Sequence, residues 1–262
     1  MSVFDFVSGS GPLLISVPHD GRLLMPGQEH AMTEASLALP DTDWHVRRLY
    51  GFASKLGASV IAANFSRYVV DLNRSPQDEI LYPGNVSTGL CPGRTFAGEA
   101  IYDDGSDVDE TERSRRVENY WRPYHDKLAA TIDDIVGRHG YVVLWDAHSI
   151  PSEVPRLFDG VLPDLNIGTN DGASCAKPVA AAAYDIARKS EFSSVLNGRF
   201  RGGYITRHYG DPGRGVHALQ LEIAQHSYMC EQSGNYRKAA AEKLQSVIET
   251  MLVGALDAAS GL

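Results

Sequence analysis

The chain has 262 residues, 43% hydrophobic and 22% charged, and this composition excludes an intrinsically disordered, collagen-like or coiled-coil protein. Its formal net charge is −9, from 24 Lys and Arg against 33 Asp and Glu. This balance argues against a nucleic-acid partner, because nucleic-acid surfaces need clustered basic residues. For the protein to bind an acidic small molecule, arginines would have to be concentrated at the binding site.

The three cysteines, Cys91, Cys175 and Cys230, are far apart and show no CxxC spacing. This spacing indicates neither a disulfide framework nor a thiolate zinc site and favours a reducing, cytoplasmic location. The chain begins without a basic segment and contains no apolar run approaching ~18 residues, so we expect neither export nor a membrane partner. The oligomeric state does not follow from these features.

Apolar runs in the first part of the chain predict strands at residues 13–17, 58–62 and 68–70. Between them, Asp41 to Leu56 carries an apolar stripe at helical spacing and predicts a helix. His19 follows the first of these strands, and Asn73 and Arg74 follow the third. Reactive side chains are often found at such strand ends.

Residues 77–110 are rich in Gly, Pro, Asp and Ser and predict a long irregular excursion, which we interpret as a lid or rim. Helices are predicted at residues 110–138, with a break near Pro123, at 178–189 and at 235–256. Strands are predicted at residues 141–145 and 216–223, with loops over 150–176 and a strand and turn over 195–209.

Strands that alternate with helices predict an α/β fold, a mostly parallel, mixed sheet flanked by helices on both faces. No composition break or internal repeat divides the chain, so we expect a single domain over residues 1–262. In this architecture ligands bind beyond the carboxyl ends of the strands. The polar clusters of this sequence are predicted to lie there.

His19 and His148 each follow an apolar strand, and neighbouring parallel strands place such residues side by side. Neutral imidazole suits zinc, so we expect the two residues to share one metal ion. Asp146, two residues before His148 on the same side of the strand, is placed to orient its ring. For either histidine alone, a hydrogen-bonded loop residue is the competing interpretation.

A catalytic zinc site usually has a third protein ligand and one open position. Four carboxylates are candidates for this ligand: Asp43, Asp41, Asp20 and Glu29. For Asp41 and Asp43, capping of the predicted helix is at least as strong an interpretation.

Glu222 sits in the largely apolar run ALQLEI, with Gln220 on the same face. A buried carboxylate there needs a partner or has a raised pKa, as a general base in hydrolysis requires. The competing interpretation is a buried ion pair with an arginine.

Asn73 and the arginines Arg67, Arg74 and Arg207 concentrate hydrogen-bond donors at predicted strand ends. Guanidinium groups bind carboxylates bidentately and stabilise oxyanions, so these residues predict an anionic ligand. Structural salt bridges are the alternative for each arginine.

Taken in order, the clusters resemble the N-formylglutamate amidohydrolase (deformylase) family of histidine degradation. The matching stretches cover nearly the whole chain: SVPHDG (16–21), DTDW (41–44), SRYVVDLNRSP (66–76), LYPG (81–84), TGLCP (88–92), YHDKL (124–128), LWDAHSIPS (144–152), FRGGYITRHYG (200–210) and GVHALQLEIAQHSYM (215–229).

That family in turn is similar to the zinc carboxypeptidase and aspartoacylase superfamily, with its zinc-exopeptidase (phosphorylase/hydrolase-like) fold. Its pattern of HxxE, Asn-Arg, DxH and a glutamate base matches His19, the Asn73–Arg74 pair, His148 with Asp146, and Glu222. At the superfamily's ligand glutamate this chain has Arg22 instead. We therefore nominate Asp43 as third ligand, expecting its helix to begin near His19.

The resemblance implies zinc-assisted hydrolysis of N-formyl-L-glutamate, a small acidic N-acyl amino acid, to formate and L-glutamate. Glu222 and Arg74 would be catalytic, and Arg67, Asn73 and Arg74 would hold the substrate carboxylates. Two alternatives stay open. One is a related N-acyl amino acid amidohydrolase or carboxypeptidase-like hydrolase, and the other is a non-catalytic domain that binds carboxylates or metal.

Overall fold

The computed structural model describes residues 1–79 and 88–262. The strands in these residues form one sheet in the order β1-β3-β2-β4-β7-β5-β6. Their bounds are β1 Phe4–Val7, β2 Leu13–Val17, β3 Ser59–Ala63, β4 Val142–Ile150, β5 Leu165–Gly168, β6 Ser194–Leu196 and β7 Val216–Ala224. β3, β2, β4 and β7 run parallel, β1 and β5 pair antiparallel with β3 and β7, and β6 is parallel to β5. The predicted mixed, mostly parallel sheet is confirmed.

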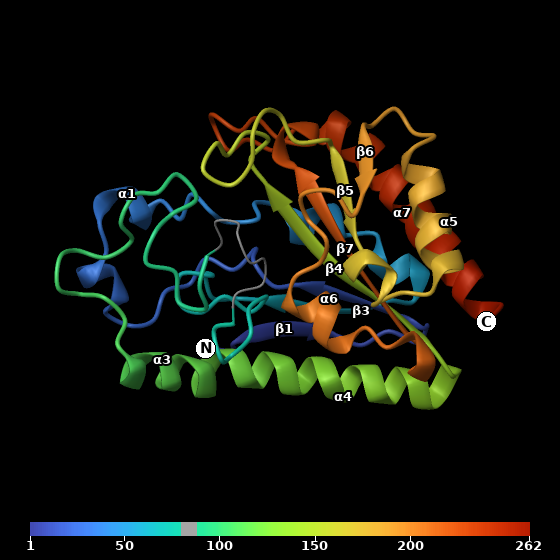
Figure 1. Ribbon diagram of the computed structural model, residues 1–262, viewed down its shortest axis with the longest axis horizontal. Helices are drawn as coiled ribbons and strands as arrows, with labels where there is room; N and C mark the ends of the chain where they lie inside the picture. Colours follow the sequence, from blue (N-terminus) through green and yellow to red (C-terminus); the bar gives the residue numbers. More distant parts are fainter. Residues whose placement is uncertain (80–87) are drawn as a thin grey trace.

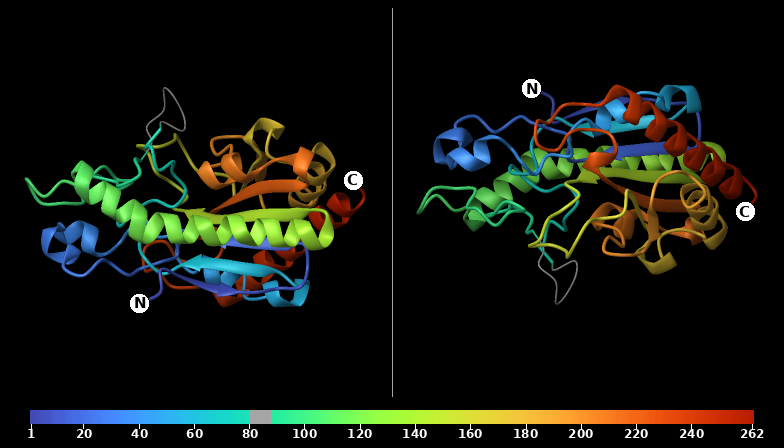
Figure 2. Two further views of the ribbon diagram at one scale, coloured as in Figure 1. Left: turned by 90° about the horizontal axis from the view of Figure 1, so that it is seen from below. Right: turned by 90° about the horizontal axis from the view of Figure 1, so that it is seen from above.

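Helices cover both faces of this sheet (Figures 1 and 2). α4 crosses one face, while α5 and α7 pack together on the other. The α-helices are α1 Glu34–Leu37, α2 Val46–Leu49, α3 Glu110–Arg116, α4 Arg122–His139, α5 Lys177–Ala187, α6 Tyr204–Tyr209 and α7 Lys238–Ser260. Over the described parts of the chain, none of them is long and apolar enough to cross a bilayer.

Two apolar cores lie on opposite sides of the sheet because successive side chains of a strand point to opposite faces. On β4, Trp145 belongs to the core under α5 and α7, whereas Leu144 packs under α4 with Leu128. All three side chains are fully buried. Burial of a large apolar side chain contributes about 1.5–3 kcal/mol, so both cores hold the sheet in place.

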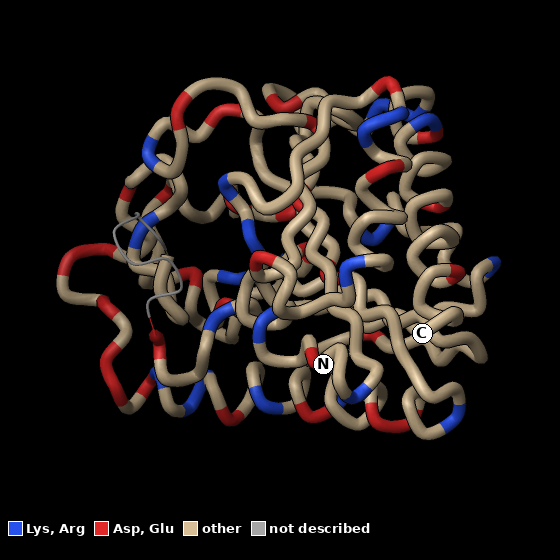
Figure 3. The backbone as a smooth tube through the Cα atoms, turned by 45° about the vertical axis from the view of Figure 1, so that its right-hand side comes forward, with Lys and Arg blue, Asp and Glu red and all other residues tan. Residues whose placement is uncertain are grey.

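The helix predicted over residues 110–138 is present, and its interruption is a π-helical turn, η3 Val117–Trp121, between α3 and α4. Pro123 follows this turn and has no backbone N–H to donate to the preceding turn. This lack of a donor favours the wider, π-helical hydrogen-bonding pattern of η3. Acidic and basic residues alternate along both helices (Figure 3). They form pairs such as Arg122 with Glu118 and Arg138 with Asp134.

The prediction of one helix from Asp41 to Leu56 is wrong. The segment contains only α2 and a 3₁₀ turn, η2 Ala53–Leu56, and Asp43 precedes both. His45 adopts a left-handed conformation with φ 64°, which a continuous helix excludes. The apolar stripe is nevertheless real, because Leu49 and Phe52 are buried in the core under α7.

The strand predicted at residues 68–70 is also wrong. Val69 N–H donates to Ser66 O at 2.9 Å and closes a turn, whose apolar side chains pack in the core under α4. Burial of a loop thus produced a strand-like pattern. β1, β5 and helix α6 were also not predicted, and β4 extends beyond its predicted end at residue 145.

The connection between β3 and α3 runs from residue 64 to residue 109. Its described part beyond residue 88 contains isolated bridges, such as Arg94 with Ala100, but no helix or strand. Residues 80–87, which include the whole LYPG stretch (81–84) of the predicted rim, lie outside the described residues.

Candidate active site

One face of the central strands changes from apolar to polar toward the carboxyl ends. On β4, Leu144 packs under α4, whereas Asp146 and His148, on the same face, are polar. The register of β4 with β7 pairs Asp146 with Gln220 and His148 with Glu222. Because neighbouring strands lie about 4.8 Å apart, His148 and Glu222 are side by side at this edge.

His19 reaches the same place from β2, which ends at Val17. Its backbone oxygen accepts a hydrogen bond from Asp43 N at 3.1 Å, which ties the loop before α2 to the end of β2. The Asp43 side chain continues to β4, since Oδ2 accepts from Ser149 N at 3.1 Å. Three segments far apart in sequence therefore meet here.

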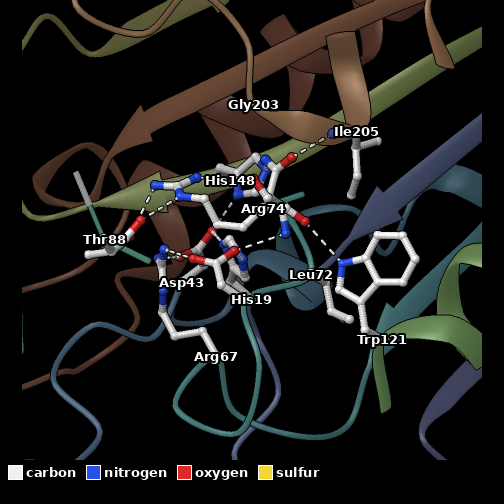
Figure 4. A network of polar contacts seen from close by, with 12 residues as sticks. His19, Asp43, Arg67, Leu72, Arg74, Thr88, Trp121, His148, Gly203 and Ile205 are labelled. Atoms are coloured by element: carbon white, nitrogen blue, oxygen red, sulfur yellow. Dashed lines mark hydrogen bonds and ion pairs between the residues drawn. The ribbon is translucent and has the colours of Figure 1, made fainter. Parts of the chain in front are cut away.

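His19, Asp43 and His148 form the candidate metal centre, and each is at least 97% buried (Figure 4). Their potential ligand atoms all lie within 4.8 Å of one another. Asp43 Oδ2 is 3.0 Å from His148 Nδ1 and 3.8 Å from His19 Nδ1. Two imidazoles and a carboxylate are the donor types of catalytic zinc sites with one open position.

Two further carboxylates orient the imidazole rings. His19 Nε2 lies 2.8 Å from Asp71 Oδ1, and His148 Nε2 lies 3.0 Å from Asp146 Oδ2. Both Nδ1 atoms are thereby directed toward the carboxylate that the rings share. Such carboxylate–histidine pairs fix the ring orientation of metal ligands, so the donor set fits a metal ion.

Negative charge accumulates around these rings. The carboxylates of Asp43, Asp71 and Asp146 are buried beside them. Arg67 Nη2 donates to Asp71 Oδ2 at 2.6 Å, and its Nη1 lies 3.9 Å from Asp43 Oδ1. Arg67 thus faces two of these three buried carboxylates, and a divalent cation held between the rings would add positive charge beside all three.

The titratable groups of the centre are displaced from their ordinary pKa values in different directions. Burial and the nearby Arg67 lower the pKa of His19. Burial also disfavours the charged form of His148, but the carboxylates on either side of it raise its pKa well above the ordinary value. For Glu222, burial raises the pKa to about 8. A carboxyl group with such a pKa is suited to exchange protons near neutral pH.

Asn73 joins the candidate metal centre to helix α6. Its Nδ2 donates to Asp146 Oδ2 at 3.0 Å and lies 2.8 Å from His148 Nε2. Its Oδ1 accepts from Ile205 N at 2.8 Å (Figure 4). These bonds occupy both ends of the amide, so Asn73 is held rigidly beside the imidazole.

The carbonyl groups on either side of Asn73 are bound by aromatic residues of η3 and α4. Arg74 O accepts from Trp121 Nε1 at 3.0 Å, and Leu72 O lies 2.8 Å from His125 Nε2. The Trp121 and His125 rings stack with centroids 3.7 Å apart. The π-helical turn thus ends at the residue that holds the Asn73–Arg74 pair.

A cavity with about 600 Å³ of empty space, part of it open to solvent, adjoins this centre. The described residues that line it are His19, Asp43, Arg67, Asn73, Arg74, Thr88, Phe96, His148, Ser149, Ile150, Leu157, Arg199, Phe200, Gly203, Gln220 and Glu222.

Comparison with known proteins identifies the family. The model of the family described as N-formylglutamate amidohydrolase matches residues 11–229. The chain belongs to this family. Proteins named N-formylglutamate deformylase from Pseudomonas putida and Pseudomonas aeruginosa are 48% and 50% identical to it over 252 residues, which are 95% of this chain and 94% of each relative. The crystal structure of N-formylglutamate amidohydrolase from Ralstonia eutropha JMP134 shares the fold, with a TM-score of 0.82, 24% identity and coverage of 97% of this chain and 98% of that one.

Most of the residues nominated from the sequence of this N-formylglutamate amidohydrolase family member lie together. The cavity wall contains His19, Asp43, His148, Glu222, Arg67, Asn73 and Arg74. Asp146 lies behind His148. Arg207 does not occur among the described lining residues. It belongs to α6, where its Nε donates to Gly202 O at 2.8 Å.

The other carboxylates considered as third metal ligand have different partners. Asp41 accepts from Phe96 N at 2.9 Å. Asp20 lies 3.5 Å from Arg22, the residue that replaces the superfamily's ligand glutamate. Glu29 lies on the surface with a side chain that is 47% exposed. Among these candidates, the described cluster contains Asp43.

Two charged residues of the site, Asp71 and Arg199, were not predicted from the sequence. Asp71 gave a detectable signal, because it precedes the Asn73–Arg74 pair by two positions at the end of the same apolar run. Arg199 gave none, since it lies inside the segment predicted as strand and turn over 195–209 and not at a predicted strand end. Its Nε donates to Leu157 O at 2.8 Å, which brings it to the cavity wall.

Proposed function

We propose that this protein hydrolyses N-formyl-L-glutamate to formate and L-glutamate. The observation that carries the proposal is the convergence of His19, Asp43 and His148 beside the buried Glu222, in a cavity lined by arginines. Family membership and the names of relatives about half identical to this chain support the substrate. The cavity suits a small N-acyl amino acid.

We further propose that His19, Asp43 and His148 hold a divalent cation, and that this cation is zinc. The fit rests on the donor types, on the orientation of both rings by carboxylates, and on the three carboxylates buried beside the rings. When bound, such a cation would polarise the formyl carbonyl and lower the pKa of a water molecule. Co²⁺ and Mn²⁺ accept similar donors, so the metal in cells also depends on availability.

Glu222 is the proposed proton carrier. It takes a proton from the attacking water, whose oxygen forms a bond to the formyl carbon. The carbon–nitrogen bond then breaks, and Glu222 returns the proton to the leaving amine. The raised pKa of Glu222, about 8, and its position beside His148 support this role.

Arg74 is the proposed ligand of a substrate carboxylate, and Asn73, whose amide is bonded at both ends, is proposed to position His148 beside it. Both line the cavity next to His148, and Arg74 is oriented by bonds from Nε to Thr88 O at 2.8 Å and from Nη2 to Thr88 Oγ1 at 3.0 Å. Arg67 is bonded to Asp71 and faces Asp43, so we assign it to the charge balance of the centre and to stabilisation of the oxyanion.

Metal analysis and formate release test the proposal together. We expect the purified protein to contain bound metal, chelation to abolish formate release, and added zinc to restore it. Asp43→Asn should lower the metal content, whereas Asp41→Asn, which removes a nearby buried carboxylate bonded to Phe96 N, should not. Loss of metal in the second variant alone would contradict our choice of ligand.

A panel of N-formyl-, N-acetyl- and N-succinyl-L-glutamate tests the acyl group. Preference for the formyl compound supports the proposal, and preference for another acyl group indicates a related amidohydrolase. Tight metal binding without hydrolysis of any acyl amino acid indicates a binding domain instead. We place the reaction in histidine degradation, and in the cytoplasm because the cysteine spacing suits a reducing compartment.

A further inference from the structure

Two arginines of the cavity wall come from different parts of the fold. Arg74 follows Asn73, whose amide lies 2.8 Å from His148 Nε2, so Arg74 is close to the metal centre. Arg199 comes from the segment between β6 and α6 and is joined to Leu157 through the bond from its Nε to the backbone oxygen.

The wall beside Arg199 is apolar. Phe96, Ile150, Leu157 and Phe200 line the cavity and belong to one apolar cluster. The guanidinium carbon of Arg199 lies 5.4 Å from the centre of the Phe200 ring. An apolar wall accommodates methylene groups, and the adjoining cation suits a carboxylate at the end of them.

We propose that Arg199 binds the side-chain carboxylate of the substrate and thereby selects N-formyl amino acids with an acidic side chain. The inference rests on the proposed function. The α-carboxylate is attached to the carbon next to the scissile nitrogen, so its ligand must lie beside the hydrolytic residues, as Arg74 does. The side-chain carboxylate of glutamate lies two methylene groups farther away, where the apolar wall leads to Arg199. This assignment replaces Arg207, which sequence analysis had suggested.

The test compares N-formyl-L-glutamate with N-formyl-L-glutamine, which has the same shape and a neutral side chain. Arg199→Met should lower kcat/KM for the acid by about 10- to 100-fold, as expected for loss of a charge-assisted pair, and change the value for the amide by less than about threefold. Arg74→Met should lower both values, because both compounds carry the α-carboxylate. Arg199→Lys keeps the charge and should retain part of the preference for the acid.

Arg201→Met is the matched control. Arg201 lies two residues farther along the same segment, has a side chain that is 52% exposed and pairs with Asp171 at 3.2 Å. We expect this variant to keep the substrate preference of the wild type. Thermal unfolding of all variants identifies any that fail to fold. If Arg199→Met fails to fold, Arg199→Lys is compared with the wild type instead.

An equal decrease for both substrates in Arg199→Met, or no decrease for either, would overturn the assignment. Failure of the proposed function is a separate result, in which the wild type hydrolyses neither compound. Calorimetric titration with L-glutamate and L-glutamine then decides the role of Arg199 without turnover. Loss of the preference for glutamate in Arg199→Met supports the inference, and an unchanged preference contradicts it.

Discussion

The two faces of β4 and β7 carry different residues at the same strand ends. Under α5 and α7, Trp145 and Leu221 continue the apolar core. On the opposite face, Asp146, His148 and Glu222 interrupt it. Because side chains alternate along a strand, one face supplies apolar burial while the other carries reactive groups. The buried charges of that second face persist because each has a hydrogen-bond or ion-pair partner.

Among the variants that test the difference between the two faces, Glu222→Gln should have the largest effect. We expect kcat to fall by about 10²- to 10⁴-fold, because an amide does not accept the proton from water. Metal content and thermal unfolding should stay close to those of the wild type, since the shape of the side chain is kept. Normal turnover in this variant would rule out Glu222 as the proton carrier.

The opposite face is probed by Leu221→Ala, one residue away on the same strand. Leu221 is fully buried, so we expect the free energy of unfolding to fall by about 2–5 kcal/mol. Chemical denaturation measures this loss. The folded variant should keep its metal and its kcat, and a large loss of kcat in fully folded protein would show that the faces are coupled.

His125, a buried residue of α4, should make the free energy of unfolding depend on pH. Burial lowers the pKa of this ring to about 3, whereas the unfolded chain binds the proton near pH 6.5. Between these values the unfolded state holds the extra proton, so the free energy of unfolding decreases as the pH falls, by up to about 1.4 kcal/mol per pH unit. Denaturation of wild type and His125→Gln at pH 7 and pH 5 measures this contribution. An identical pH dependence in both proteins would contradict it.

The smallest expected effect is that of Trp121→Phe, which removes the hydrogen bond to Arg74 O and keeps an aromatic ring. Loss of one such bond costs about 0.5–1.5 kcal/mol, so KM should rise by about two- to tenfold with little change in kcat. Trp44→Phe is the matched control, since Trp44 packs against Arg22 and is not among the described residues that line the cavity. A fall in kcat with unchanged KM would show that Trp121 acts on the chemical step.

Part of this site could be predicted because it depends on local patterns and on one rule of topology. Apolar runs located β2, β4 and β7, and parallel strands bring their carboxyl ends together. His19, His148 and Glu222 therefore emerged as neighbours from sequence. Asp146 followed from its spacing of two residues from His148 along an extended strand.

Other residues could not be selected in this way, because their positions depend on the paths of loops. Asp43 was chosen among four carboxylates because a helix was expected to begin there, and that helix does not form. The hydrogen bond from Asp43 N to His19 O is what places Asp43 beside the histidines. Arg199 reaches the site through a segment that shows no regular period.

The amino-acid sequence by itself determined the type of fold, the family and the side chains at the strand ends, since these follow from side-chain periodicity and ordered motifs. Only the tertiary structure decided which carboxylate joins the two imidazoles and which arginine completes the cavity. The physical reason is that loop positions are set by contacts between residues far apart in sequence. The hydrogen bonds of Asp43 to β2 and β4, and of Arg199 to Leu157 O, are contacts of this kind.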